Sequence, residues 1–264
     1  MSIQANPPTH RPLALVTGGA KRLGRATALE LAAAGCDVII TYRDSDRDAH
    51  ATVRDMIQLG GSPDICAAEA LDLGNIEEVE SFARRVAASW GRLDVLVHNA
   101  STYLQTPLEK IAPHDLMAAY TVNAAAPLLL SARLAPLLAQ SPMRGGGSIV
   151  AMCDIHAMGE HGLPRSEGFA AYALSKAALA EMVRTLAREL APRVRVNGVA
   201  PGVAAWPESG HESDRAAQEA YIKRVPLQRA GTPEECAEVV RWLALEATYT
   251  TGEIVRFDGG RNMV

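Results

Sequence analysis

The chain has 264 residues, of which 48% are hydrophobic and 21% are charged, and its formal net charge is −4. This mixture is typical of a globular protein, and the small negative charge argues against a surface for nucleic acid or anionic lipid. The four cysteines form no CxxC pair and have no matching histidine spacing: Cys36, Cys66, Cys153 and Cys236. We therefore expect reduced thiols and no metal site.

Residues 1–11 are polar and include Pro7 and Pro8, which predicts a flexible N-terminal tail rather than a secretory signal. No segment approaches the 18 uninterrupted apolar residues of a membrane span. We expect a cytoplasmic protein with one domain over residues 12–264, since no linker or repeat divides the chain.

Short apolar runs alternate with longer segments of helical periodicity from residue 13 onward. The runs predict strands at Leu13–Thr17, Asp37–Tyr42, Asp64–Ala70, Asp94–His98, Ser148–Met152, Val194–Val199 and Glu253–Phe257. The periodic segments predict helices at Leu23–Ala34, Arg47–Leu59, Ile76–Trp90, Leu116–Gln140, Phe169–Leu190 and Pro233–Leu245. This alternation predicts an α/β fold, a doubly wound Rossmann-type sandwich whose central parallel sheet has about seven strands.

A glycine-rich turn, TGGAKRLG at residues 17–24, joins the first strand to the first helix. Glycines let the backbone approach a diphosphate closely, and the helix N-terminus attracts that anion. The spacing misses the GxGxxG fingerprint, but its place in the first βαβ unit favours a dinucleotide site. The expected cofactor contacts at this turn are Gly18, Lys21, Arg22, Leu23 and Gly24.

The end of the second strand bears on which nicotinamide cofactor binds. An NAD site has a carboxylate there for the ribose 2′-hydroxyl, whereas this chain has Tyr42 and Arg43. Arg43 can pair with a 2′-phosphate, which predicts NADP(H), although Asp44 and Asp46 follow and either could turn inward. Further cofactor contacts are expected where the third and fourth strands end: Asp72, Leu73, Asn99, Ala100 and Ser101.

Tyr172 and Lys176 have the i, i+4 spacing that puts two side chains on one face of a helix. A nearby cation stabilises phenolate, so we expect Lys176 to lower the pKa of Tyr172 and make it a general acid for a reduction.

From about residue 12 to 260 the chain resembles the short-chain dehydrogenase/reductase family. The resemblance rests on the glycine turn, Asp72, Asn99-Ala100, Asn123, the Tyr172/Lys176 pair, the segment from Val196 to Gly202 and Phe257-Asp258-Gly259-Gly260. It implies that Tyr172 is the catalytic acid, that Lys176 also holds the nicotinamide ribose, and that Asn123 supports a proton-relay water. It also implies Pro201 and Gly202 beside the nicotinamide, and a homotetramer built on the helices near 116–140 and 169–190.

Two departures from the general family pattern resemble its pteridine reductase branch. Arg22 stands where the family usually has glycine, and Asp154 stands where it usually has a catalytic serine. The branch implies that Arg22 contacts both cofactor phosphate and pterin, and that Asp154 assists Tyr172 in protonation. The substrate contacts that it implies are Arg22, Ser101, Tyr103, Asp154, Tyr172 and Trp206, with Tyr103 stacking on the pterin and residues 204–208 forming a lid.

The expected function is therefore NADPH-dependent reduction of a pterin, either a 7,8-dihydropterin or dihydrofolate. Residues 156–171 are longer than usual for the branch and form either a substrate-selecting insert or a plain surface loop. Two alternatives stay open: a general carbonyl or 3-oxoacyl reductase of the same family, and a non-catalytic NADP(H)-binding protein. His98, in place of the first asparagine of a family motif, is a mild departure.

Overall fold

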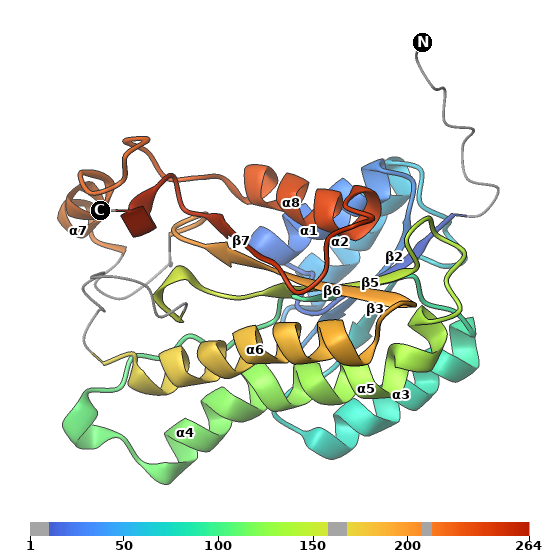
Figure 1. The fold of residues 1–264 in the computed structure, drawn as a ribbon, viewed down its shortest axis with the longest axis horizontal. Coiled ribbons are helices and arrows are strands. Elements are labelled where there is room, and N and C mark those ends of the chain that lie inside the picture. Colours follow the sequence, from blue (N-terminus) through green and yellow to red (C-terminus); the bar gives the residue numbers. More distant parts are fainter. Residues whose placement is uncertain (1–10, 158–167, 207–212, 264) are drawn as a thin grey trace.

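The computed structural model describes residues 11–157, 168–206 and 213–263, and the seven strands form one parallel sheet (Figure 1). The strands are β1 Leu13–Val16, β2 Asp37–Tyr42, β3 Ala67–Ala70, β4 Val95–His98, β5 Gly147–Met152, β6 Val194–Pro201 and β7 Ile254–Phe257. Their order across the sheet is β3-β2-β1-β4-β5-β6-β7. The predicted doubly wound fold is confirmed.

Apolar side chains on successive strand residues point to opposite faces of the sheet, and both faces are covered. In β1, Leu13 and Leu15 join one buried cluster, while Ala14 and Val16 join the other. A strand with two buried faces needs apolar residues at every position, which is why the strands appear in the sequence as continuous apolar runs.

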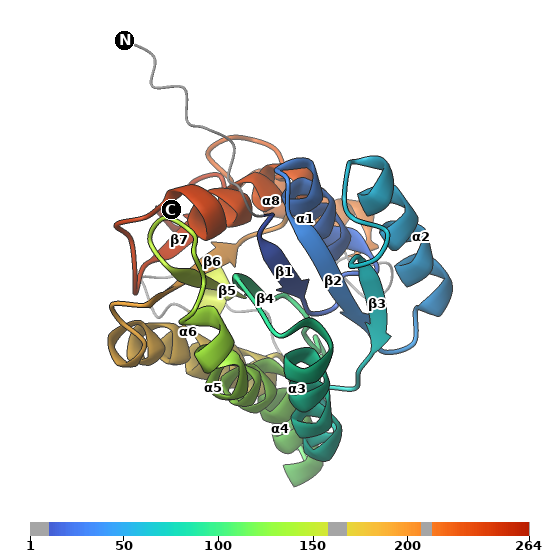
Figure 2. The ribbon, with the colours of Figure 1, turned by 90° about the vertical axis from the view of Figure 1, so that its right-hand side faces the viewer.

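Helices cover the sheet in two layers (Figure 2). One layer holds α1 Arg22–Ala33, α2 Asp46–Gln58 and α8 Pro233–Arg241, and the other holds α3 Ile76–Trp90, α4 Pro113–Tyr120, α5 Ala126–Leu138 and α6 Ala170–Glu189. A further helix, α7 Arg215–Ile222, lies beyond the end of β6. Single 3₁₀ turns occur at Leu108–Lys110, Ile155–Ala157 and Arg261–Met263.

Three expectations for the elements need correction. The predicted helix 116–140 is α4 and α5 joined by a π turn at Thr121–Ala125. The third strand starts at Ala67 instead of residue 64, because the amides of Ile65 and Cys66 bond back to the carbonyl of Ser62 in a turn. Helix α7 was not predicted, since its segment shows no clear apolar periodicity.

The joined helix Pro113–Leu138 is, among the described residues, the one helix long and apolar enough to cross a membrane by length and composition. Its second half packs against α3 and its first half against α6. Leu130, Leu134 and Leu138 are fully buried in the core. The core helix of a folded domain has this composition too, and these contacts account for it.

The order of the strands places a crevice at the carboxyl edge of the sheet. From β1 the chain moves to β2 on one side, and from β3 it returns to β4 on the other side. Ligands of such sheets bind where the strand order reverses. Three predicted segments lie partly outside the described residues: the tail at 1–10, the insert at 158–167 and the lid at 207–208.

Candidate active site

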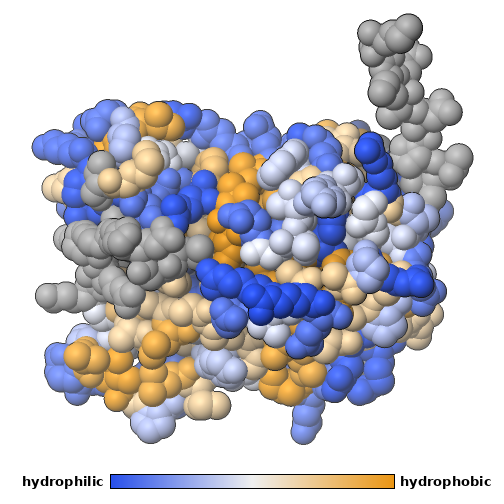
Figure 3. Space-filling model, viewed as in Figure 1, coloured by the Kyte–Doolittle hydropathy of each residue, from blue (hydrophilic) through white to orange (hydrophobic). Residues whose placement is uncertain are grey.

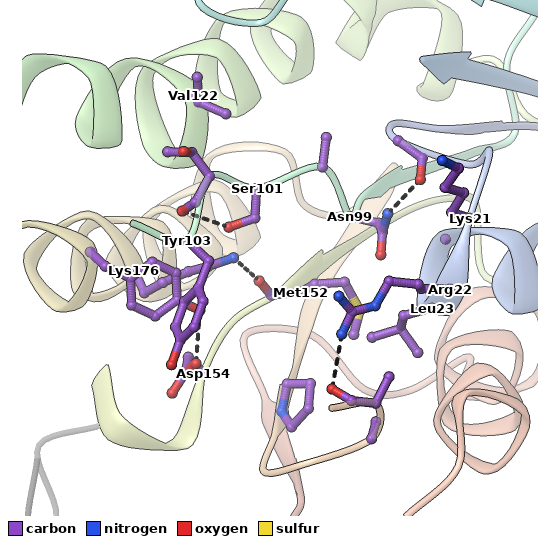
Figure 4. A pocket seen from close by; sticks show the side chains of 18 of the residues that line it. Lys21, Arg22, Leu23, Asn99, Ser101, Tyr103, Val122, Met152, Asp154 and Lys176 are labelled. Carbon is purple, nitrogen blue, oxygen red and sulfur yellow. Dashed lines mark hydrogen bonds between the residues drawn. The ribbon is translucent and has the colours of Figure 1, made fainter. Parts of the chain in front are cut away.

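A cavity of about 670 Å³ opens at the carboxyl edge, within the size range of small-molecule sites. Arg22 and Asn99 lie on one side of it, and Tyr103, Asp154 and Lys176 lie on the other (Figure 4). The predicted residues that line it are Gly18, Lys21, Arg22, Leu23, Gly24, Tyr42, Arg43, Asp72, Leu73, Asn99, Ala100, Ser101, Tyr103, Asp154, Tyr172, Lys176, Pro201 and Gly202. Two others, Asn123 and Trp206, are not among its lining residues.

The glycine turn is close-packed against the end of β4. Gly18 has a φ of +65°, and a Cβ atom added to Gly24 would lie 2.1 Å from the carbonyl oxygen of Gly18. The side-chain amide of Asn99 donates to the carbonyls of Thr17 and Gly18 at 2.9 and 3.0 Å. The turn thus holds the start of α1 against the cavity, which is the arrangement that binds a dinucleotide diphosphate.

Arg22 occupies a strained position in this turn. Its φ is +51°, in the left-handed region that favours glycine, which explains why the family usually has glycine here. Its guanidinium crosses the cavity, and Nη2 donates to the carbonyls of Ala205 and Trp206, each at 3.0 Å. Arg22 therefore ties the glycine turn to the segment after β6.

The basic residues at the cofactor end already have acidic neighbours. The guanidinium of Arg43 lies 2.7 Å from Asp44, and the Lys21 ammonium lies 3.0 Å from Asp48. All four side chains are about half exposed or more, so a phosphate can compete for the cations. Asp72 accepts from the amide of Gly74 in a tight turn, so one of its oxygens is used locally.

Asp154 lies directly against Tyr172 at the reaction end. The phenol donates to Oδ2 of Asp154 at 2.8 Å. Lys176 is buried and donates to the carbonyl of Met152 at 2.7 Å, and its Nζ lies 5.8 Å from the centre of the Tyr172 ring.

The expected effect of Lys176 on Tyr172 is wrong in this structure. Burial, and then the charge of Asp154, raise the pKa of Tyr172 well above its usual value. Burial likewise lowers the pKa of Lys176. The ammonium bonds to a carbonyl rather than to the phenol oxygen, so it does not offset the carboxylate. Tyr172 is held as a neutral phenol, a form that can give a proton but not take one.

Asp154 has a second partner, which the sequence did not predict. The imidazole Nδ1 and the backbone amide of His156 lie 2.9 and 2.8 Å from Oδ1 of Asp154. Burial opposes ionisation of this carboxyl, but the bonds from His156 and Tyr172 outweigh burial and hold its pKa below the usual value.

Asn123 is buried in the π turn, and its side chain is bonded within the protein. Its Oδ1 accepts from the hydroxyl of Ser101 and the amide of Thr102, and its Nδ2 donates to the carbonyl of Thr102 and the hydroxyl of Ser175. These bonds tie the loop after β4 to α6. The relay-water role that the family implies for Asn123 stays a prediction.

The ring of Tyr103 is about half exposed but already stacks on a protein ring. Phe169 lies over it, with ring centres 4.6 Å apart and planes 20° apart. Tyr172 meets Tyr103 edge-on at 4.8 Å. The ring of Trp206 packs edge-on against that of Tyr221, with ring centres 5.6 Å apart, and its contact with substrate stays a prediction. A substrate stacking on Tyr103 has to use the other ring face or displace Phe169.

Sequence reasoning missed several residues at the site. Tyr221, Arg224 and Arg261 line the cavity, and Phe169 lines an adjoining cavity. His156 also lines the cavity; it belongs to the 156–171 insert that was expected near the pocket, but its bond to Asp154 was not predicted. Tyr221 lies on α7, Arg224 follows it and Arg261 lies near the C-terminal end, and no sequence motif marks any of them.

Among the described residues, no group of three or more His, Cys, Asp or Glu side chains could hold a metal ion. All four cysteines are buried and none is bonded to another, and the reduced state of their thiols stays a prediction. Burial raises the pKa of Cys36, Cys153 and Cys236 to about 12, so these thiols are inert.

The sequence matches a family model described as enoyl-(acyl carrier protein) reductase over residues 18–262. It is 33% identical to a 3-oxoacyl-[acyl-carrier-protein] reductase of Synechocystis sp. over 95% of this chain and 97% of that protein. It is 34% identical to pteridine reductase 1 of Leishmania tarentolae, over 96% of each. A short-chain dehydrogenase of Burkholderia cenocepacia, solved in complex with NADP, superposes with a TM-score of 0.84 at 34% identity, over 95% of this chain and 98% of that one.

These similarities identify the type of enzyme more firmly than they identify its substrate. A 3-oxoacyl-[acyl-carrier-protein] reductase of Thermotoga maritima also matches at 34% identity. Because such reductases recur among the relatives, the comparisons alone favour a general carbonyl or 3-oxoacyl reductase over a pteridine reductase.

Proposed function

Because this chain belongs to the short-chain dehydrogenase/reductase family, we propose that it is an NADPH-dependent reductase of a pterin, either a 7,8-dihydropterin or dihydrofolate. One observation carries the choice of substrate, the Asp154 carboxylate 2.8 Å from the Tyr172 phenol. A carbonyl oxygen needs one acid as it is reduced, and a neutral hydroxyl can polarise it. A pterin ring nitrogen needs proton delivery among several polar atoms, and a carboxyl group suits that task.

NADP(H), the cofactor bound by the Burkholderia cenocepacia relative, supplies the hydride when bound. The glycine turn and the start of α1 would hold its diphosphate, and Arg43 would pair with its 2′-phosphate. Pro201 and Gly202, at the end of β6, would lie beside the nicotinamide.

The residues of the chain supply the proton. Tyr172 is neutral because burial and Asp154 raise its pKa, so it has a proton to donate. Asp154 accepts the phenol hydrogen bond and fixes the direction of the hydroxyl. Lys176, bound to the carbonyl of Met152, keeps a positive charge near the ring of Tyr172. A site with its acid kept protonated favours reduction over oxidation.

Two further residues support a flat, nitrogen-rich substrate. Arg22 lines the cavity and carries planar donors that match ring oxygen and nitrogen atoms. Tyr103 offers an aromatic face next to Tyr172, and a flat ring gains by stacking there.

The second candidate is a general carbonyl or 3-oxoacyl reductase, and the relatives from Synechocystis sp. and Thermotoga maritima favour it. Under this function Tyr172 protonates a carbonyl oxygen, and Asp154 serves to position the phenol. The two candidates share every cofactor contact and differ in what Asp154 does.

The test compares NADPH oxidation by the purified protein with two panels: dihydrobiopterin, dihydromonapterin and dihydrofolate in one, and 3-oxoacyl thioesters and simple ketones in the other. We expect turnover with a pterin. No pterin turnover alongside rapid carbonyl reduction would establish the second candidate. Cofactor binding without turnover of either panel would mean a non-catalytic NADP(H)-binding protein.

Asp154→Ser gives the family's usual residue and separates the roles of this position. We expect pterin turnover to fall by about 10²-fold or more, within the range of a lost general acid, while any carbonyl turnover persists or rises. Asp64→Ser, at an exposed loop position, is the matched control and should leave both rates unchanged. Equal effects of Asp154→Ser on the two panels would contradict the pterin assignment.

A further inference from the structure

Asp154 joins two titratable side chains that come from different parts of the chain. Its Oδ2 accepts from the Tyr172 phenol at 2.8 Å, and its Oδ1 faces Nδ1 of His156 at 2.9 Å. The His156 side chain is 31% exposed and Asp154 is 16% exposed, and the Tyr172 phenol is bonded to the carboxylate oxygen that His156 does not contact. The three groups therefore form a line from the solvent to the reacting phenol.

The chemistry of the three groups determines which atom donates each hydrogen bond and which accepts it. An ionised carboxylate only accepts hydrogen bonds, so Nδ1 of His156 must carry a proton in this arrangement. The backbone amide of His156 also donates to Oδ1 at 2.8 Å, which orients the ionised carboxylate toward the imidazole. Within the part of the chain that the structure describes, no hydrogen bond is formed by Nε2 of His156, and the side chain is partly exposed, so this nitrogen can exchange a proton with water.

We propose that His156 is a positioning residue that returns protons from the solvent to Tyr172 through Asp154. This inference rests on the proposed reductase function of the site. Each turnover takes the phenol proton for the substrate and leaves a phenolate. Doubly protonated His156 then gives its Nδ1 proton to Oδ1 of Asp154. After the carboxyl group turns about its Cβ–Cγ bond, that proton passes to the phenolate, and water recharges the imidazole.

Over residues 11–157, 168–206 and 213–263, few other titratable groups lie near His156, Asp154 and Tyr172. Tyr103 and Glu109 line a second cavity, which adjoins the first and which His156, Asp154 and Tyr172 also line. Lys176 lies behind the Tyr172 ring and donates to the carbonyl of Met152. Among the described residues, Asp154 is the one carboxylate that is hydrogen-bonded to both the imidazole and the phenol.

Two variants test the relay in the full chain with NADPH. His156→Gln keeps an N–H donor for Asp154 but cannot pass on a proton, and His156→Ala opens space for added imidazole. We expect each to lower kcat at least about tenfold with little change in the KM for NADPH, since positioned proton transfer contributes roughly 10²–10⁴-fold. The fall of kcat at high pH in the native enzyme should be absent in His156→Gln. Added imidazole should restore the alanine variant but not the glutamine variant.

His114→Gln is the matched control, because His114 also lies beside an aspartate, at 3.4 Å, but is 83% exposed on α4. If the His156 variants match this control in kcat and pH profile, the relay is wrong. Nitrogen-15 shifts of the ring give a readout without turnover or variants, and an unprotonated Nδ1 in the native protein would also overturn the proposal.

The substrate panels keep this inference separate from the proposed function. The relay is measured with whichever panel the native protein reduces, because either reduction takes its proton from Tyr172. Failure with pterins alone counts against the proposed substrate, whereas unchanged kinetics of the His156 variants count against the relay.

Discussion

At residue 22 the backbone adopts a left-handed φ of +51° although the residue is not glycine. Such a conformation costs a residue with a Cβ atom about 1–2 kcal/mol. Its guanidinium meanwhile donates to the carbonyls of Ala205 and Trp206 across the cavity. Strain of this kind concentrates at functional sites.

The strain at residue 22 predicts an order of stability between two variants. Arg22→Gly and Arg22→Ala lose the same side-chain bonds, but glycine adopts a positive φ without strain. We expect the free energy of unfolding, measured by denaturant titration, to be about 1 kcal/mol higher for the glycine variant than for the alanine variant. Both should lose activity, and equal stabilities would show that the turn relaxes in the variants.

Arg43 should decide between the two nicotinamide cofactors. If it pairs with the 2′-phosphate, Arg43→Ala removes a charge-assisted bond worth about 1.5–3 kcal/mol. The KM for NADPH should then rise roughly 10- to 100-fold, while the KM for NADH, which lacks that phosphate, stays the same. Arg47→Ala, at an exposed position in α2, is the control. An equal rise for both cofactors would contradict the role of Arg43.

His98 links two elements, because Nε2 of its ring lies 2.8 Å from the hydroxyl of Ser131, and so β4 is joined to α5. The ring is fully buried, and burial lowers its pKa to about 3. In the unfolded chain a histidine titrates near pH 6.5. Between these values the unfolded chain binds the extra proton, so the stability of the fold decreases as the pH falls from about 6.5 toward 3.

The effect of His98 on stability can be tested by measuring how the free energy of unfolding depends on pH. His98→Asn introduces the family's more usual residue and removes the titrating ring. We expect the free energy of unfolding of the variant to change less between pH 6.5 and 4.5, with a difference in slope of at most about 1.4 kcal/mol per pH unit. Parallel curves for the two proteins would show that His98 is protonated in the folded state.

The elements were predictable from sequence where burial imposes a pattern. Strands such as β1 are apolar throughout, and β5 is apolar except for Ser148, because helices cover both faces of the sheet. The π turn at Thr121–Ala125 was not predictable, since one extra residue in a turn leaves the helical periodicity nearly unchanged. Helix α7 has only eight residues and none of them is fully buried, so it is too short to stand out in the sequence as a periodic segment.

The candidate site was predictable where a motif carries it and not where contacts form across space. Tyr172, Lys176 and Asp154 stand at motif positions, and the structure brings them together. The stacking of Phe169 on Tyr103 joins residues far apart in the chain, so neither sequence position indicates it. The raised pKa of Tyr172 likewise depends on which way the Lys176 ammonium points.

The molecule has an uncovered apolar area on its helical layer. Figure 3 shows hydrophobic residues gathered along the lower part of the view, where α4 and α5 lie in Figure 1. The exposed apolar residues of α4, α5, α6 and the loop before them are Leu104, Leu108, Leu116, Met117, Tyr120, Leu128 and Leu174. Exposed apolar areas of this kind mark protein interfaces in folded proteins.

We therefore propose that the chain assembles as a homotetramer through these helices. Light scattering should give four times the mass of 28.1 kDa. Met117→Glu combined with Leu128→Glu should lower that mass, because charges would be buried in the interface. Leu59→Glu, at an exposed position after α2, should not. A monomeric mass for the native protein would overturn the proposal. The cytoplasmic location stays a prediction that a fluorescent fusion would test.

The bond between Arg22 and the segment after β6 has a consequence for how this enzyme can diverge. Both acceptors are main-chain oxygens, those of Ala205 and Trp206, and every amino acid offers one. Mutations at these two positions can therefore change the side chains near the pocket mouth without cutting the tie to the glycine turn. As this gene evolves, the side chains at positions 205 and 206 can therefore change, while the bonds from Arg22 continue to hold this segment against the glycine turn.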